Sequence, residues 1–226
     1  MLNNLSEYKT LVFDCDGVVL NSNKVKTQAF YNSTLPFGKS AAKAMVDYHI
    51  KNGGISRYSK FDYFLKSIAP EYAGNPDVLS IKELLSIYAE EVRKGLLSCE
   101  ITNGLSVLRE QTSDSRWMIV SGGDQKELRE IFKVRNIDQY FDGGIFGSPA
   151  TKDEILNELT IDGRLQKPAL FIGDSKYDFE AASGADLDFV FIRAWSEVDD
   201  IDSWLMLNGI YGLNFVSDLS ETMWKK

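Results

Sequence analysis

Short, uninterrupted apolar runs, each followed by a polar loop, constrain the fold of this chain more than any other feature. They cover residues 10–13, 116–120, 169–172 and 188–192, and a shorter run covers 144–146. Continuous runs, unlike alternating ones, are typical of parallel strands that are covered on both faces. Helical patterns separate them at 124–134, 152–159 and 177–183. The alternation predicts a doubly wound α/β fold around a parallel sheet.

The segment from residue 21 to 95 breaks this alternation. Its patterns are helical, at 24–31, 40–51, 60–68 and 78–94, and none of its runs reads as a convincing strand. We interpret it as an α-helical cap domain inserted after the first strand. The core domain then comprises residues 1–20 and 96–226, a division that suits a chain of 226 residues.

Charge and composition exclude several classes of protein. The formal net charge is -8 and the pI is about 4.8, so the surface should repel nucleic acid. No apolar stretch approaches the ~20 residues of a membrane span, and no signal peptide is evident. We therefore expect a cytoplasmic protein with Cys15 and Cys99 reduced. A single histidine, His49, excludes His-rich zinc sites, and the absence of a G-x-S-x-G elbow argues against a Ser-His-Asp hydrolase.

Four aspartates follow two of the predicted strands. Asp14 and Asp16 come after the run at 10–13, and Asp174 and Asp178 come after the run at 169–172. One aspartate after a strand is often an ordinary turn or cap residue. The carboxyl ends of parallel strands converge, however, and clustered carboxylates repel one another unless a cation lies between them. The combined set therefore predicts a Mg²⁺ site.

Two further features could hold a phosphate group. Ser121, Gly122 and Gly123 follow the run at 116–120, where glycine lets the backbone approach a ligand and Ser121 can donate its hydroxyl. Lys152 opens a predicted helix, a place where the helix dipole disfavours a cation unless an anion compensates. Alone, the first could be a plain strand-to-helix turn and the second a solvated lysine.

Taken together, these residues resemble the motifs of the haloacid dehalogenase superfamily. Residues 13–19 (FDCDGVV) resemble its first motif, Ser121 the second, Lys152 the third and residues 173–178 (GDSKYD) the fourth. Their order and spacing agree over nearly the whole chain. Two departures stand out: Asn21 replaces the usual aspartate after the first motif, and the third motif reads GSPATK at 147–152 instead of G-K-P.

The resemblance implies a role for each carboxylate. Asp14 would attack phosphorus and form an aspartyl-phosphate, and Asp16 would protonate the leaving oxygen and then activate water. Mg²⁺ would be held by Asp14, the backbone carbonyl of Asp16 and Asp174, with Asp178 acting on the metal or its waters. Because dehalogenases of this superfamily lack the second aspartate, Asp16 favours phosphoryl transfer.

The resemblance also assigns the phosphate contacts. Ser121, Gly122 and Lys152 would hold the transferring phosphoryl group and neutralise its charge. Lys167 is the nearest rival to Lys152, but it precedes a strand and should lie at the opposite edge of the sheet. Cys15 between the two aspartates is expected to be a buried apolar residue without a chemical role.

In the cap, residues 53–57 (GGISR) resemble the G-V-S-R loop of β-phosphoglucomutase. This suggests Arg57, and less strongly Lys60, as contacts to an anionic part of the substrate, although Arg57 could equally be an exposed loop residue. The sequence thus predicts a Mg²⁺-dependent phosphatase acting on a small phosphorylated metabolite, with a sugar phosphate as one candidate. A sugar phosphomutase and a non-catalytic binding protein on the same fold are the alternatives.

Overall fold

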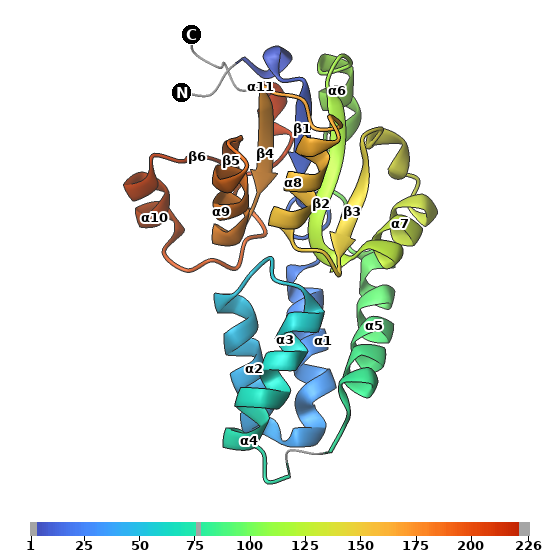
Figure 1. The fold of residues 1–226 in the computed structure, drawn as a ribbon, viewed down its shortest axis with the longest axis vertical. Helices are drawn as coiled ribbons and strands as arrows, with labels where there is room; N and C mark the ends of the chain where they lie inside the picture. The colour runs from blue at the N-terminus through green and yellow to red at the C-terminus, as the bar shows by residue number, and fades with distance from the viewer. Residues whose placement is uncertain (1–3, 76–77, 222–226) are drawn as a thin grey trace.

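A six-stranded parallel sheet forms the centre of the core in the computed structural model, which describes residues 4–75 and 78–221 (Figure 1). The strand order is β3-β2-β1-β4-β5-β6. The strands are β1 (Thr10–Phe13), β2 (Arg116–Asp124), β3 (Gly144–Ser148), β4 (Ala169–Gly173), β5 (Asp188–Ile192) and β6 (Tyr211–Leu213). The predicted doubly wound α/β fold is confirmed. β6, three residues at the sheet edge with a glycine at its centre, has no signature in the sequence.

The topology places a crevice at the carboxyl end of β1. This strand pairs in parallel with β2 on one side and β4 on the other, so the chain winds outward in both directions from it. Ligands of open α/β sheets bind where the winding reverses. The loops after β1 and β4 and the last residues of β2, which include the Ser121 segment, meet at this point.

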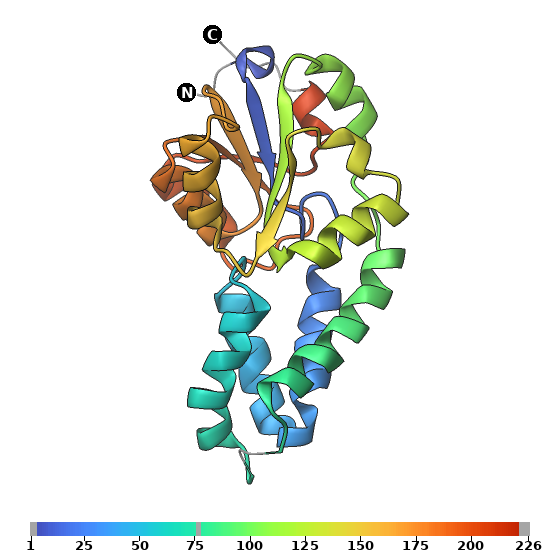
Figure 2. The ribbon, with the colours of Figure 1, turned by 45° about the vertical axis from the view of Figure 1, so that its right-hand side comes forward.

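Helices cover both faces of the sheet, as Figure 2 shows. The alternation within β1 explains this, because Val12 joins one apolar cluster while Leu11 and Phe13 join the other. One face holds α8 (Lys152–Ile161), α9 (Lys176–Gly184) and α10 (Ile201–Asn208), and the other holds α6 (Leu105–Gln111), α7 (Gln125–Val134) and α11 (Asp218–Glu221). Single 3₁₀ turns cover Leu5–Glu7, Leu35–Phe37 and Asp138–Tyr140.

Helices are the only regular elements among the described residues of the inserted segment. It comprises α1 (Asn23–Thr34), α2 (Lys39–Lys51), α3 (Arg57–Tyr63), a π turn (Phe64–Ile68), α4 (Ala69–Tyr72) and α5 (Ile81–Ser98). Aromatic rings fill its interior, with the centroid of Phe30 5.2 Å from that of Phe61 and 4.4 Å from that of Tyr88. The proposed domain boundary at residue 95 falls within α5, which continues to Ser98 because Leu96 is buried.

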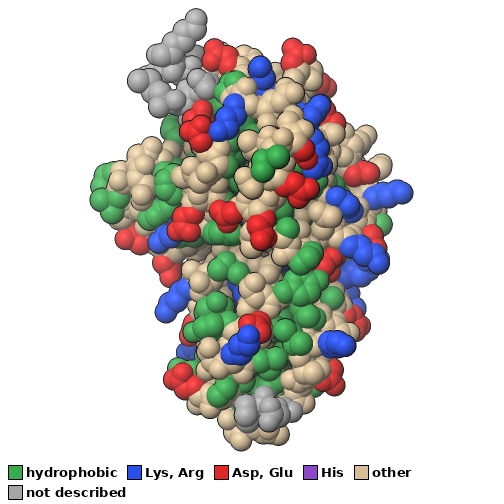
Figure 3. Space-filling model, in the orientation of Figure 1, with side chains coloured by type: hydrophobic (Ala, Val, Ile, Leu, Met, Phe, Trp, Pro, Cys, Tyr) green, Lys and Arg blue, Asp and Glu red, His purple; other side chains and the backbone are tan. Residues whose placement is uncertain are grey.

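Acidic and basic side chains are interspersed over the face in Figure 3, with several acidic side chains on the core close to the cap. This pattern agrees with the formal net charge of -8. Within the described part of the chain, we find no helix with the length and apolar character that crossing a membrane requires.

Helices α1 and α5 connect the cap to the core and pack against each other (Figure 1). Gly95 of α5 lies where α1 approaches most closely: a Cβ atom on it would lie 2.2 Å from Cγ1 of Val25. Valine in a helix has one strongly preferred rotamer and cannot easily turn away. The close contact of the two connecting helices therefore requires glycine at position 95.

Gly95→Ala should lower the free energy of unfolding by about 1–2 kcal/mol, although alanine is the better helix former by about 1 kcal/mol. The added methyl group must displace the Val25 side chain. Urea denaturation measures this, and a Val25→Ala background should remove most of the penalty. A Gly95→Ala variant more stable than the wild type in both backgrounds would contradict the packing argument.

Candidate active site

Three buried carboxylates meet at the carboxyl ends of β1 and β4. Oxygen atoms of Asp14, Asp174 and Asp178 all lie within 4.8 Å of one another. The backbone N–H of Asp14 donates to Ile172 O at 2.9 Å, so the sheet ladder itself fixes its position. Gly17 lets the chain turn away with φ +77°, and a Cβ there would lie 1.9 Å from Oδ2 of Asp174. The turn thus needs glycine for both its conformation and its space.

Asp178 braces the loop that carries Asp174. Its Oδ2 accepts hydrogen bonds from the Ser175 hydroxyl at 2.6 Å, from the Ser175 N–H at 3.0 Å and from the Asp174 N–H at 3.2 Å. Ser175 in turn caps α9, so the helix start and the carboxylate support each other. Asp178 thus holds the backbone of the loop that carries Asp174, and its action on a metal or its waters stays a prediction.

Lys152 lies between two of these carboxylates. Its Nζ contacts Oδ1 of Asp14 at 3.0 Å and forms an ion pair with Oδ1 of Asp178. Burial alone would lower the pKa of Lys152, but Asp14 and Asp178 outweigh this and raise it above its usual value. Lys152 therefore stays charged, and these carboxylates already compensate a cation at the start of α8.

One ammonium group does not balance the cluster. Burial, together with repulsion from Asp178 and Asp16, raises the pKa of Asp14 to about 7 against the opposing effect of Lys152. Burial and the neighbouring Asp14 and Asp178 raise the pKa of Asp174 well above its usual range. A divalent cation among these oxygens would relieve the repulsion, and hard carboxylate oxygens suit Mg²⁺. The residues present therefore fit the predicted metal.

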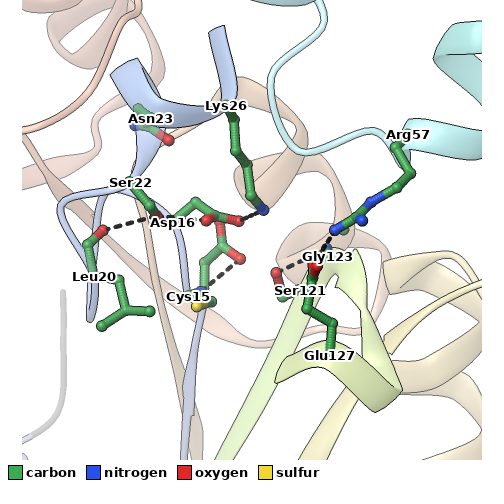
Figure 4. A network of polar contacts seen from close by, with 12 residues as sticks. Cys15, Asp16, Leu20, Ser22, Asn23, Lys26, Arg57, Ser121, Gly123 and Glu127 are labelled. Atoms are coloured by element: carbon green, nitrogen blue, oxygen red, sulfur yellow. Dashed lines mark hydrogen bonds and ion pairs between the residues drawn. The ribbon is translucent and has the colours of Figure 1, made fainter. Parts of the chain in front are cut away.

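The carboxylate of Asp16 is directed towards Lys26 of the cap helix α1 (Figure 4). Its Oδ1 accepts from the Ser22 hydroxyl at 2.5 Å, and its Oδ2 forms an ion pair with Lys26. Burial opposes ionisation, but the Lys26 ammonium prevails and lowers the pKa of Asp16. A metal contact of Asp16 through its backbone carbonyl stays a prediction. Cys15, between the two aspartates, is fully buried.

Sequence reasoning missed the contribution of α1 to the site. Lys26 contacts Asp16, and the Asn23 amide donates to Oδ2 of Asp174 at 2.7 Å and to the Trp195 carbonyl at 2.8 Å. The available signal was helical spacing: Ser22 and Lys26 lie four residues apart, and so share one face at the start of a helix. These contacts occur close to Asn21, where the chain departs from the family pattern.

The second predicted motif lies directly opposite the cap. The Ser121 hydroxyl is buried and accepts from the Gly123 N–H at 3.0 Å. β2 continues through Gly122 and Gly123 to Asp124 before α7 begins. A Cβ on Gly122 would lie 2.1 Å from the carbonyl oxygen of Gly54. Gly122 is therefore the position where the cap loop touches the core.

The cap cations have partners of their own. Arg57 forms an ion pair with Glu127 of α7 (Figure 4), and the neighbouring Tyr58 hydroxyl donates to Asp124 at 2.6 Å. Nζ of Lys60 lies 2.6 Å from Nδ1 of His49. Both Arg57 and Lys60 line a cavity of about 60 Å³ that also reaches Asp14, Asp16 and Asp174. The structure thus places the predicted cap residues and the core aspartates around one cavity.

The rival lysine lies elsewhere. Lys167 precedes β4 and Asp174 follows it, so the two residues lie at opposite ends of this strand. Nζ of Lys167 contacts the exposed Asp186 at 2.9 Å. The neighbouring Pro168 carbonyl accepts from the N–H of Lys9, before β1 begins. Of the two lysines considered from the sequence, only Lys152 reaches the carboxylate cluster.

Mg²⁺ should stabilise the protein, and more at about pH 8 than at about pH 5.5. A raised carboxyl pKa means that the native state keeps a proton which the unfolded chain has lost. Without metal, this lowers the free energy of unfolding as the pH rises from about 4 to about 7. Above that range Asp14 is ionised, and Mg²⁺ at 100 times its Kd should add about 2.7 kcal/mol.

The measurement is the thermal denaturation midpoint with Mg²⁺ and with chelator at both pH values. Asp174→Asn should lose most of the Mg²⁺ effect, whereas Asp186→Asn, at an exposed position, should keep it. A stabilisation that is larger at the acidic pH, or that Asp174→Asn retains, would refute a metal site at this cluster.

Comparison with known structures places this geometry on a shared fold. CbbY from Rhodobacter sphaeroides in complex with phosphate aligns with a TM-score of 0.68 at 16% identity, over 94% of this chain and 96% of that chain. The same protein, as a mutant, was also solved with xylulose-1,5-bisphosphate. A candidate phosphoglycolate phosphatase from Lactobacillus plantarum gives 0.70 at 22% identity, over 95% and 98% of the two chains. A candidate β-phosphoglucomutase from Thermotoga maritima gives 0.62 at 16% identity, over 94% and 97%.

The TM-scores show a common fold. Family membership rests instead on the match of the sequence to a family model. A comparison with curated proteins returns no match. The family model for haloacid dehalogenase-like hydrolases matches residues 11–192, a span that contains all four motifs. The chain belongs to the family of haloacid dehalogenase-like hydrolases.

Proposed function

We propose that this hydrolase is a Mg²⁺-dependent phosphatase of small phosphorylated metabolites, with Asp14 as its nucleophile. The observation that carries the proposal is the position of Asp14. Its carboxylate is buried at the cavity, next to Lys152 and to the carboxylates of Asp174 and Asp178. Asp16 is held separately, by its ion pair with α1. CbbY, which was solved with phosphate and, as a mutant, with xylulose-1,5-bisphosphate, supports this class of substrate. We place the reaction in the cytoplasm, where the free thiols of Cys15 and Cys99 would stay reduced.

The contacts of Asp14 select its attacking atom. Oδ1 accepts from the Cys15 N–H at 2.7 Å and contacts Lys152 at 3.0 Å, which leaves Oδ2 to attack phosphorus. The Ser121 hydroxyl and the Lys152 ammonium would hold the phosphoryl oxygens and offset their charge. Mg²⁺ held by Asp14 and Asp174, with Asp178 behind, would stabilise the negative charge of the transferring group.

Asp16 would act twice. In the first half it protonates the leaving oxygen, and in the second half it takes a proton from the water that cleaves the aspartyl-phosphate. The Lys26 contact favours ionised Asp16, the form that the second half needs. Proton donation in the first half requires this contact to loosen. Because Lys26 belongs to the cap helix α1, we infer that cap movement is coupled to the protonation of Asp16.

The loop at residues 53–57 and the structural likeness to a candidate β-phosphoglucomutase favour phosphomutase activity as the second candidate. A mutase would return the phosphoryl group from Asp14 to a second hydroxyl of the substrate instead of passing it to water. It should therefore need a bisphosphate for turnover and release little free phosphate from monophosphates.

Phosphate release from a panel of sugar phosphates, phosphoglycolate, nucleotides and an aryl phosphate tests the proposal. With Mg²⁺, Asp14→Asn should lower turnover by at least about 10³-fold, because the nucleophile is lost. Asp186→Asn is the matched control and should retain activity. No release from any monophosphate would overturn the phosphatase. Turnover primed by a bisphosphate would then establish a mutase, and inactivity with measurable Mg²⁺ binding would favour a non-catalytic protein.

The two lysines weighed from the sequence provide a second test. Lys152→Met should lower kcat by about 10²–10³-fold, because the variant lacks the buried positive charge that would stabilise the transferring phosphoryl group. Lys167→Met should leave kcat within about twofold, since an exposed ion pair contributes little. Circular dichroism checks that both variants fold. Equal activity of the two variants would rule out the assigned role of Lys152.

A further inference from the structure

The cap side of the cavity carries a positive charge that no carboxylate balances. Among the described residues, three cationic side chains line this cavity: Lys26, Arg57 and Lys60. Lys26 is paired with Asp16 and Arg57 with Glu127. Lys60 forms no ion pair with any described carboxylate. Of these three cavity-lining cations, only Lys60 has no carboxylate partner among the described residues.

Lys60 is buried to an unusual degree for a lysine, with 1% of its surface exposed. Its Nζ lies 5.5 Å from the ring centroid of Phe30, and its hydrogen-bond partners are Nδ1 of His49 at 2.6 Å and the His49 carbonyl at 3.4 Å. Burial, with Lys26 acting in the same direction, lowers the pKa of Lys60 to about 7. An incoming negative charge would reverse this penalty.

His49 adds a second unsatisfied group. When Lys60 is charged, its ammonium can only donate to Nδ1, and the ring hydrogen of the neutral His49 then resides on Nε2. Nε2 is buried without a hydrogen-bond partner among the described residues. Burial and the nearby Lys60 lower the pKa of His49 well below its usual value, so the ring stays neutral. A buried donor without an acceptor is costly, which again indicates a missing oxygen atom.

Two of the four carboxylates that line the cavity act on Lys60, but both have other hydrogen-bond partners. Glu197 accepts from the Thr27 hydroxyl at 2.9 Å, and Asp16 is held by Ser22 and Lys26. Both act on Lys60 only through space. Neither can therefore supply the acceptor that Lys60 and His49 lack in this arrangement.

We propose that Lys60 and His49 form a subsite for a second anionic group, a carboxylate or a second phosphate, at the end of the substrate remote from the reacting phosphoryl group. This inference rests on the proposed phosphatase function and narrows its substrate to doubly anionic phosphoesters. Arg57, the other cap candidate, is already paired with Glu127. The cavity of about 60 Å³ has space for only a few water molecules, so the cap must move to admit such a substrate.

Two matched pairs of substrates test the subsite. Phosphoglycolate is compared with 2-hydroxyethyl phosphate, and pentane-1,5-diol bisphosphate with 5-hydroxypentyl phosphate. The first pair tests a carboxylate and the second a distal phosphate. We expect the wild type to prefer the anionic member of at least one pair by about tenfold or more in kcat/KM. Lys60→Met and Lys60→Gln should bring this ratio close to one, and His49→Phe should reduce it.

Lys66→Met is the matched control, because Lys66 belongs to the same cap but is exposed and paired with Asp62. It should keep the wild-type ratio. A wild type without preference in either pair would overturn the subsite, as would a preference that both Lys60 variants retain.

Binding separates this inference from the proposed function. In the Asp14→Asn background, calorimetry with Mg²⁺ measures the affinity for the same four esters without turnover. Tighter binding of an anionic member, lost on adding Lys60→Met, would support the subsite even if the wild type released no phosphate. Equal affinity for both members of each pair would refute it even if phosphatase activity were found.

Discussion

The burial of three carboxylates beside a single lysine is the constraint on which the rest of this structure depends. Asp14, Asp174 and Asp178 lie within a few ångströms of one another, and Lys152 supplies only one positive charge. Like charges at such distances cannot all ionise at neutral pH without a further cation. The strand ends, the Ser175 cap of α9 and the start of α8 all hold this electrostatically unfavourable cluster in place.

Ion pairs, as well as the two connecting helices, join the cap to the core. Lys26 of α1 pairs with Asp16, and Arg57 of α3 pairs with Glu127 of α7 (Figure 4). The backbone of Gly54 also approaches Gly122 so closely that a Cβ atom on Gly122 would lie 2.1 Å from the Gly54 carbonyl oxygen. Any movement that opens the cavity must therefore break buried polar contacts, so substrate binding has to compensate for them.

Positive side chains gather on the cap side of the cavity, although the chain as a whole is acidic. The chain as a whole has a formal net charge of -8, and acidic side chains lie on the core near the cap (Figure 3). Inside the closed cap, Lys26, Arg57 and Lys60 line the cavity. A small anion on the cap side of the cavity would meet these cations at a low dielectric, where each charge acts more strongly.

The sequence by itself determined the sheet, the helical insertion and the positions of Asp14, Ser121, Lys152 and Asp174, because apolar periodicity and motif order are local properties of the chain. It did not determine β6, which is too short and too exposed to leave a pattern. Only the tertiary structure decided which charges pair. Arg57 and Glu127 are 70 residues apart in the chain, and their contact depends on how the cap meets the core. The same holds for the packing inside the cap that leaves Lys60 without a carboxylate.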